Sequence, residues 1–147
     1  MSRLLSVSSV LCLLVLLAAC GGDSGGNPVA PTIPPQPFTI TDLRVGTGDE
    51  AVNGKVLTVN YAGWLYSTTG PDNKGSLFDT SVGSTPYVFT LGANAVIKGW
   101  DQGLVGMKVG GVRRLIVPPE LAYGASGRGP IPPNANLVFD VELLGVQ

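Results

Sequence analysis

The residues in this chain that could do chemistry are aromatic rather than ionisable or nucleophilic. Trp100 stands in a short run with helical spacing, Tyr123 lies beside a glycine-rich loop, and Phe139 falls on an alternating strand. Aromatic side chains offer large apolar surfaces that pack with defined geometry. If the fold brings these three together, they line a pocket that fits a small apolar ring. The alternative for each of them is ordinary packing in a hydrophobic core.

Several common forms of catalysis are excluded. The chain contains no histidine, which rules out a Ser-His-Asp triad, a Cys-His pair and a histidine-ligated zinc ion. It has no Gly-x-x-x-x-Gly-Lys phosphate loop, and the glycine-rich residues 124–129 follow no clear strand and open no clear helix. No cluster of carboxylates suggests a metal site. We therefore expect no metal and no cofactor, so any catalysis must come from shape and from a low local dielectric.

The N-terminus has the pattern of an export signal. Residues 1–19 combine Arg3, an apolar stretch over 4–19 and small residues at the end, and the stretch is shorter than the ~20 residues that span a bilayer. The sequence Leu17-Ala18-Ala19-Cys20 resembles the lipobox of bacterial lipoproteins. That resemblance implies cleavage before Cys20 and a diacylglycerol on its sulfur. An ordinary secretory signal with a chance cysteine is the alternative.

The residues after the signal indicate a tether to a membrane. Residues 20–37 are rich in glycine and proline, so we expect the lipidated Cys20 followed by a flexible linker. Cys12 would leave with the signal, so the folded domain would have no disulfide and no cysteine metal ligand. We expect a membrane-anchored lipoprotein of the cell envelope that faces the periplasm or the cell exterior. If the source is Gram-negative, Gly21 in place of aspartate favours the outer membrane.

Residues 38–147 are predicted to form a single folded domain. Ile97, Trp100 and Leu104 recur at helical spacing, and Gly106 would end a helix of two or three turns. Residues 67–76 read as a polar loop. The predicted strands cover 38–45, 56–66, 77–79, 87–91, 112–117 and a last strand from residue 137. This pattern indicates an α+β fold, in which a curved antiparallel β-sheet of five to six strands wraps around one short α-helix.

The alternation along these strands predicts which side chains are buried. Trp64 and Tyr66 are expected at the surface or in contact with a partner. The residues assigned to the core are Leu57, Val59, Leu115, Val117, Val141 and Leu143.

The domain resembles the FKBP-type peptidyl-prolyl cis-trans isomerases across nearly all of residues 38–147. The motifs that support this resemblance, in chain order, are Val59-Asn60-Tyr61-Ala62-Gly63, Phe78-Asp79-Thr80-Ser81, Val96-Ile97-Lys98-Gly99-Trp100, Ala122-Tyr123-Gly124, Ile131-Pro132-Pro133 and Leu137-Val138-Phe139. The resemblance implies the FKBP-like fold, and it implies that the ring in the pocket is that of proline.

The resemblance also assigns roles to individual residues. Trp100 is similar to the tryptophan at the pocket floor, and Asp79 is similar to an aspartate beside the twisted amide. The Tyr123 hydroxyl would bond the ligand, the Ile97 N–H would bond a substrate carbonyl, and Ile131 would lie on a flap above the pocket. The implied catalytic residues are Tyr61, Phe78, Asp79, Trp100, Tyr123 and Phe139, and the implied substrate-binding residues are Tyr87, Phe89, Val96, Ile97 and Ile131.

Three segments depart from the family pattern. The loop at 67–76 is longer than in the smallest members. Residues 82–86 are about one residue short and lack an arginine that some members place near the aspartate, which leaves the partner of Asp79 unknown. Residues 127–131 are also about one residue short and place Pro130 where many members have an aliphatic residue. These changes affect the shape of the flap and the preference for the residue before proline.

Two functions of different kinds fit the sequence. The first is an isomerase acting on X-Pro bonds of exported proteins, which would assist folding at the cell envelope. The second is a non-catalytic module or chaperone that binds proline-containing peptides on the same fold, and a bare membrane spacer is a more remote third.

The expected partners are proline-containing polypeptides, the macrolide inhibitors of the family and the membrane. A net charge of about −2 after signal removal gives no basis for nucleic-acid binding, and we expect a monomer.

Overall fold

The computed structural model describes residues 33–147. The predicted signal segment, Cys20 and most of the predicted linker lie outside the described residues. Seven elements make up the described domain, with short 3₁₀ turns at Pro71–Asn73 and Pro119–Leu121. In chain order they are β1 (Thr39–Arg44), β2 (Val56–Tyr66), β3 (Lys74–Thr80), β4 (Tyr87–Thr90), α1 (Lys98–Gly103), β5 (Val112–Val117) and β6 (Leu137–Val146).

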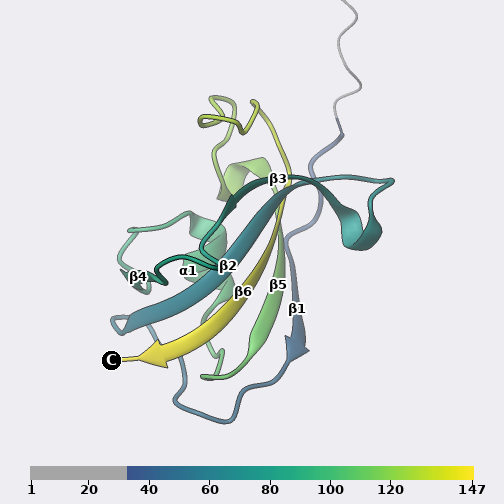
Figure 1. Ribbon diagram of the computed structural model, residues 1–147. Coiled ribbons are helices and arrows are strands. Elements are labelled where there is room, and N and C mark those ends of the chain that lie inside the picture. The colour runs from purple at the N-terminus through teal and green to yellow at the C-terminus, as the bar shows by residue number, and fades with distance from the viewer. Residues whose placement is uncertain (1–32) are drawn as a thin grey trace, which may run out of the picture. The chain divides into compact units, whose positions relative to one another are not determined.

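The strands form one six-stranded sheet in the order β1-β5-β6-β2-β3, and β4 pairs with the other half of β2. Every strand pair is antiparallel. The long strands β2, β6 and β5 run side by side and twist across the molecule, and α1 lies on one face of the sheet (Figure 1). The predicted α+β architecture of a curved antiparallel sheet around one short helix is therefore confirmed.

The core lies between α1 and the inner face of the sheet. The six residues that alternation assigned to the core, from Leu57 to Leu143, are all at most 1% exposed. Trp100 of α1 and Leu104, which directly follows the helix, are buried against them. The helix approaches the sheet closely because Gly99 has no side chain, since a Cβ there would lie 2.5 Å from a methyl carbon of Val117.

Helix α1 is shorter than predicted, with six residues and fewer than two turns. It ends at Gly103, and Gly106 lies in the following turn with a φ of 76°. A buried side chain stabilises this early end. The Arg113 guanidinium donates to the carbonyls of Gly103 and Val105, at 2.8 and 3.0 Å, and pairs with Asp42 at 2.6 Å. Carbonyls at the end of a helix have no partner within the helix, so Arg113 satisfies them.

Other element boundaries also differ from the sequence-based expectation. β3 begins at Lys74, three residues earlier than predicted, because the 3₁₀ turn at Pro71–Asn73 completes the chain reversal early. On β6, Val138 faces away from the core side yet is fully buried. It lies between Trp64 of β2 and Ile116 of β5 in the sheet register. Trp64 itself is half-buried, since the Lys74 ammonium lies 4.0 Å above its ring.

The last residues of the predicted linker contact the domain. Asn136 is 4% exposed, accepts a hydrogen bond from the Gln36 N–H at 2.7 Å and donates to the Pro34 carbonyl at 3.0 Å. Residues 33–37 are therefore better described as part of the domain than as free linker. Sequence composition alone could not indicate this, because the contact depends on one asparagine about a hundred residues further along the chain.

Replacing Arg113 by methionine should weaken the whole domain. The substitution keeps most of the side-chain volume but leaves the carbonyls of Gly103 and Val105 without this donor, so we expect the free energy of unfolding to fall by about 2–4 kcal/mol. Urea unfolding followed by circular dichroism measures this. Arg44→Met is the control, because Arg44 makes a solvent-exposed pair whose loss should cost less than about 1 kcal/mol. Equal losses in the two variants would contradict the capping role of Arg113.

Candidate active site

A cavity of about 950 Å³ opens between the inner face of the sheet, α1 and the 118–136 segment. This is within the usual size range of small-molecule sites. Ten of the eleven predicted catalytic and substrate-binding residues line it: Tyr61, Phe78, Asp79, Tyr87, Val96, Ile97, Trp100, Tyr123, Ile131 and Phe139. The fold thus collects side chains from β2, β3, β4, α1, β6 and two loops around one space.

Trp100 forms the floor, and three rings stand nearly perpendicular to it. Its ring centroid lies 5.1 Å from that of Tyr61, 5.4 Å from Phe139 and 6.4 Å from Tyr87, with interplanar angles of 79°, 83° and 77°. Phe78 stands edge-on to Phe139 at 5.6 Å. Edge-to-face packing of this kind is favourable for aromatic pairs. The result is a flat base with upright walls.

Phe89 is the predicted site residue that does not line the cavity. It is 6% exposed, stacks on Tyr87 at 5.8 Å and tilts against Trp100 at 5.7 Å. The alternation along β4 correctly places Phe89 on the same face as Tyr87. However, Tyr87 covers it from the cavity, so Phe89 supports the wall from behind instead of touching a ligand.

Asp79 has a partner that the sequence did not reveal. The Tyr61 hydroxyl donates to the Asp79 carboxylate at 2.5 Å. Burial raises the pKa of Tyr61 above its ordinary value, and the hydrogen bond to Asp79 and its negative charge raise it further. The tyrosine therefore stays protonated and acts as a donor. A neutral hydroxyl therefore pairs with Asp79 in this chain.

The loop before α1 is ordered by a side chain of the helix. The Asp101 carboxylate accepts hydrogen bonds from the N–H groups of Gly92 and Asn94, at 2.8 and 3.0 Å. The Ile97 carbonyl accepts from the Trp100 N–H at 2.9 Å. Within residues 33–147, the N–H of Ile97 donates to no protein acceptor. Because Ile97 lines the cavity, this donor is available to a ligand carbonyl.

The segment above the pocket is a tight double turn. Arg128 and Ile131 exchange two backbone hydrogen bonds, each 2.9 Å long, and Asn134 donates from its N–H to the Gly124 carbonyl. Ile131 is thereby brought over the cavity. The Arg128 guanidinium lies 5.7 Å from the centre of the Tyr123 ring. Burial raises the pKa of Tyr123, so its hydroxyl is also a proton donor.

One glycine makes room for the wall. A Cβ on Gly63 of β2 would lie 2.7 Å from Cζ of Phe78 and 2.8 Å from Cε1 of Phe139. Real Cβ atoms do not approach other atoms so closely, so any side chain at this position must displace a ring. Gly63 pairs with Phe139 on one side and with Asp79 on the other. It therefore connects two pocket strands.

Sequence reasoning missed several lining residues. Arg128, Glu120 and Lys98 bring charge to the rim, while Pro119, Ala122 and Pro130 add apolar surface. Lys98 is the first residue of α1, and the others lie in the turns between β5 and β6, where no periodic pattern indicates which side chains turn inward. A missed support residue is Ser81, which is buried and accepts a hydrogen bond from the Tyr61 N–H at 3.0 Å. The Phe78-Asp79-Thr80-Ser81 motif was the available signal for it.

Comparison with known proteins decides the family. Residues 48–144 match the model of the family described as FKBP-type peptidyl-prolyl cis-trans isomerase. This chain belongs to the FKBP family. It is 51% identical to the FK506-binding protein of Neisseria meningitidis serogroup B over 109 residues, which are 73% of this chain and 94% of that protein. It is also 51% identical over 110 residues to Peptidyl-prolyl cis-trans isomerase FKBP15-3 of Arabidopsis thaliana, covering 74% and 73% of the two chains.

Solved FKBP structures have the same fold. The crystal structure of AtFKBP13 superposes with a TM-score of 0.65 at 38% identity, covering 79% of this chain and 98% of that one. For FkpA from Escherichia coli the TM-score is 0.64 at 42% identity, with 75% of this chain and 48% of that one covered. The chain is thus an FKBP-type peptidyl-prolyl isomerase.

Over residues 33–147, this FKBP domain brings together no group of three or more histidine, cysteine or acidic side chains that could hold a metal ion. In the same part of the chain, no helix has the length and apolarity needed to cross a membrane.

Gly63→Ala should damage the pocket of this FKBP domain more than the fold. The added methyl group must push Phe78 or Phe139 out of position, so we expect catalytic efficiency on an X-Pro peptide to fall about tenfold or more, since a small misplacement of site groups has large effects on rate. A peptide isomerisation assay measures this. Gly145→Ala on β6 is the matched control, because its nearest neighbour would be 3.9 Å away. Unchanged efficiency in Gly63→Ala would show that the ring positions are not critical.

Proposed function

We propose that this FKBP is a lipid-anchored isomerase that accelerates the cis-trans interconversion of X-Pro bonds in exported proteins at the cell envelope. The observation that supports catalysis best is the set of upright rings around Trp100. They enclose a cavity large enough for a proline ring, beside the Ile97 N–H, which donates to no acceptor among residues 33–147.

The reaction that such a pocket promotes follows from the electronic structure of the amide. Resonance makes rotation about the peptide bond cost ~18–20 kcal/mol, and the uncatalysed X-Pro exchange takes tens to hundreds of seconds. The planar amide separates charge between oxygen and nitrogen, and twisting it reduces that separation. Water therefore stabilises the planar form more than the twisted one.

A pocket lined by rings reverses this preference. The Phe139 and Phe78 rings offer no hydrogen-bond partner to the planar dipole, so the enzyme binds the twisted amide relatively better than water does. Lowering the barrier by about 5 kcal/mol corresponds to an acceleration of several thousand-fold. No proton transfer and no covalent intermediate are needed, which fits a chain without histidine.

The substrate would be oriented by polar groups at the edges of the pocket. By similarity to the family, the Ile97 N–H would donate to a substrate carbonyl and the Tyr123 hydroxyl would donate to a second acceptor. Asp79, with its carboxylate bonded by Tyr61, would lie near the twisted amide. Two of the relatives are named for binding FK506 or for isomerase activity. We propose that this chain likewise binds proline-containing polypeptides and FK506-type macrolides.

A proline-peptide exchange assay tests the enzymatic proposal. We expect wild-type protein to accelerate exchange, an FK506-type macrolide to inhibit it, and Trp100→Phe and Phe139→Leu each to lose about tenfold or more in kcat/KM because the walls no longer fit. Val141→Ala is the control for general destabilisation, since Val141 is buried on β6, the strand of Phe139, but does not line the cavity. Saturable peptide binding without acceleration would instead favour the non-catalytic module.

The membrane part of the proposal depends on Cys20. Its support is the Leu17-Ala18-Ala19-Cys20 sequence after an apolar segment. Lipid chains on this residue would anchor the protein stably, because two or more chains exceed the marginal affinity of one.

Cys20→Ser should therefore release the protein from membranes. After expression in a bacterial host and cell fractionation, we expect the wild type in the membrane fraction and the variant in the soluble fraction. Detection of a lipid-modified N-terminal peptide by mass spectrometry is the second measurement. A variant that still sediments with membranes would contradict lipid anchoring at this residue, and it would leave the isomerase proposal intact.

A further inference from the structure

Strand β3 contributes two pocket residues but is attached on one side only. It pairs with β2 and with no other strand of the described sheet. Its residues are mostly exposed, and its register against β2 shifts twice, on either side of Trp64. The backbone ladder alone therefore does not fix where Phe78 and Asp79 lie.

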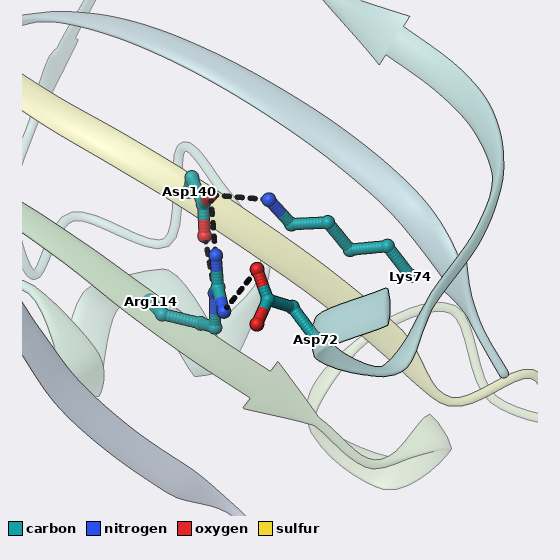
Figure 2. A network of polar contacts seen from close by, with 4 residues as sticks. All are labelled: Asp72, Lys74, Arg114 and Asp140. Atoms are coloured by element: carbon teal, nitrogen blue, oxygen red, sulfur yellow. Dashed lines mark hydrogen bonds and ion pairs between the residues drawn. The ribbon is translucent and has the colours of Figure 1, made fainter. Parts of the chain in front are cut away.

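A second attachment exists on the outer face of the sheet, away from the pocket. Asp140 of β6 accepts from the Lys74 ammonium at 2.6 Å and from two nitrogens of the Arg114 guanidinium, at 2.7 and 2.9 Å. Arg114 also pairs with Asp72 in the turn before β3, at 3.3 Å. Figure 2 shows these four side chains converging from β5, β6 and the start of β3.

The network is well shielded from water. The side chains of Lys74 and Asp140 are each 20% exposed and that of Arg114 is 16% exposed. Charge pairs with such limited exposure are screened less than surface pairs. The hydrogen bonds from Arg114 and Lys74 lower the pKa of Asp140 in spite of its burial, so the carboxylate stays charged at neutral pH.

The network acts at the point where β3 begins. Lys74 is the first residue of β3, and Phe78 follows four residues later. Asp140 directly follows Phe139, whose ring faces the pocket and contacts Phe78 edge-on. Asp140 therefore contacts the start of β3 through an ion pair on the outer face of the sheet. Its neighbour Phe139 contacts the other end of β3 through an aromatic ring on the inner face.

We propose that the Asp140 network positions β3 for the isomerase reaction, so that Asp140 is a positioning residue although it lies outside the aromatic pocket. This inference rests on the proposed isomerase function. The network fixes the start of β3. The second register shift then brings Phe78 against Phe139 and places Asp79 within reach of the Tyr61 hydroxyl.

The chain offers a closely matched control. Glu142 lies two residues further along the same strand and on the same face, and it pairs with Arg44 at 2.6 Å. That pair connects to β1, at the far edge of the sheet, and its side chains are 57% and 38% exposed. Removing either carboxylate deletes one negative charge from β6, but only Asp140 contacts the start of β3.

The test compares Asp140→Asn with Glu142→Gln. We expect Asp140→Asn to lower kcat/KM on an X-Pro peptide at least fivefold and Glu142→Gln to change it less than twofold, with urea unfolding used to verify that both are folded. The amide NMR signals of residues 77–79 should move in Asp140→Asn, while those of α1 stay in place. A purely stabilising network would not produce this selective pattern.

Lys74→Met provides a second route if Asp140→Asn does not fold. It removes the ammonium but keeps an aliphatic chain over Trp64, and we expect the same loss, with Lys74→Arg retaining most of the activity. The inference is overturned if folded Asp140→Asn or Lys74→Met keeps wild-type kcat/KM with unshifted signals at 77–79. Absence of acceleration by the wild type would instead refute the proposed function, and the NMR comparison would still decide whether the network positions β3.

Discussion

The active site of this FKBP depends on the close contact between one very short helix and the sheet beneath it. An isolated helix of six residues is not stable in water, because its own hydrogen bonds are too few. Packing against the sheet must therefore stabilise it. Gly99 permits the approach to Val117, and Arg113 satisfies the carbonyls at the helix end. This contact fixes Trp100 as the floor, and it also fixes the start of the helix, where the Ile97 N–H remains open.

The walls remain upright because the rings support one another. Tyr61 and Phe139 contact Trp100 edge-on, Phe78 contacts Phe139, and Phe89 supports Tyr87 from behind. Each such aromatic pair is worth about 0.5–1.5 kcal/mol beyond the area that it buries. Since the rings pack against their neighbours and not into the centre, the space between them stays vacant. Gly63 leaves room for the Phe78 and Phe139 rings because it carries no side chain.

Much of the fold could be predicted from alternation and turn residues. The bounds of β2 and β5 and the six core residues agree with the structure, because one face of each strand is buried and the pattern is regular. Alternation did not predict the features that depend on one side chain from a distant part of the sequence. Arg113 shortens α1, Tyr61 becomes the partner of Asp79, and Asn136 binds residues that composition assigned to the linker. Periodicity indicates which face of a strand or helix is buried, but it does not indicate such contacts between individual side chains.

If Cys20 is lipidated as proposed, the contact between Asn136 and residues 34–36 would limit how far the domain can reach from the membrane. Only residues 21–33 would then lie between Cys20 and the attached segment, and a fully extended chain of this length reaches about 45 Å. The pocket could then serve only polypeptides that pass close to the lipid headgroups. A chain emerging from a translocation pore would meet these conditions, whereas a client far from the membrane would be out of range.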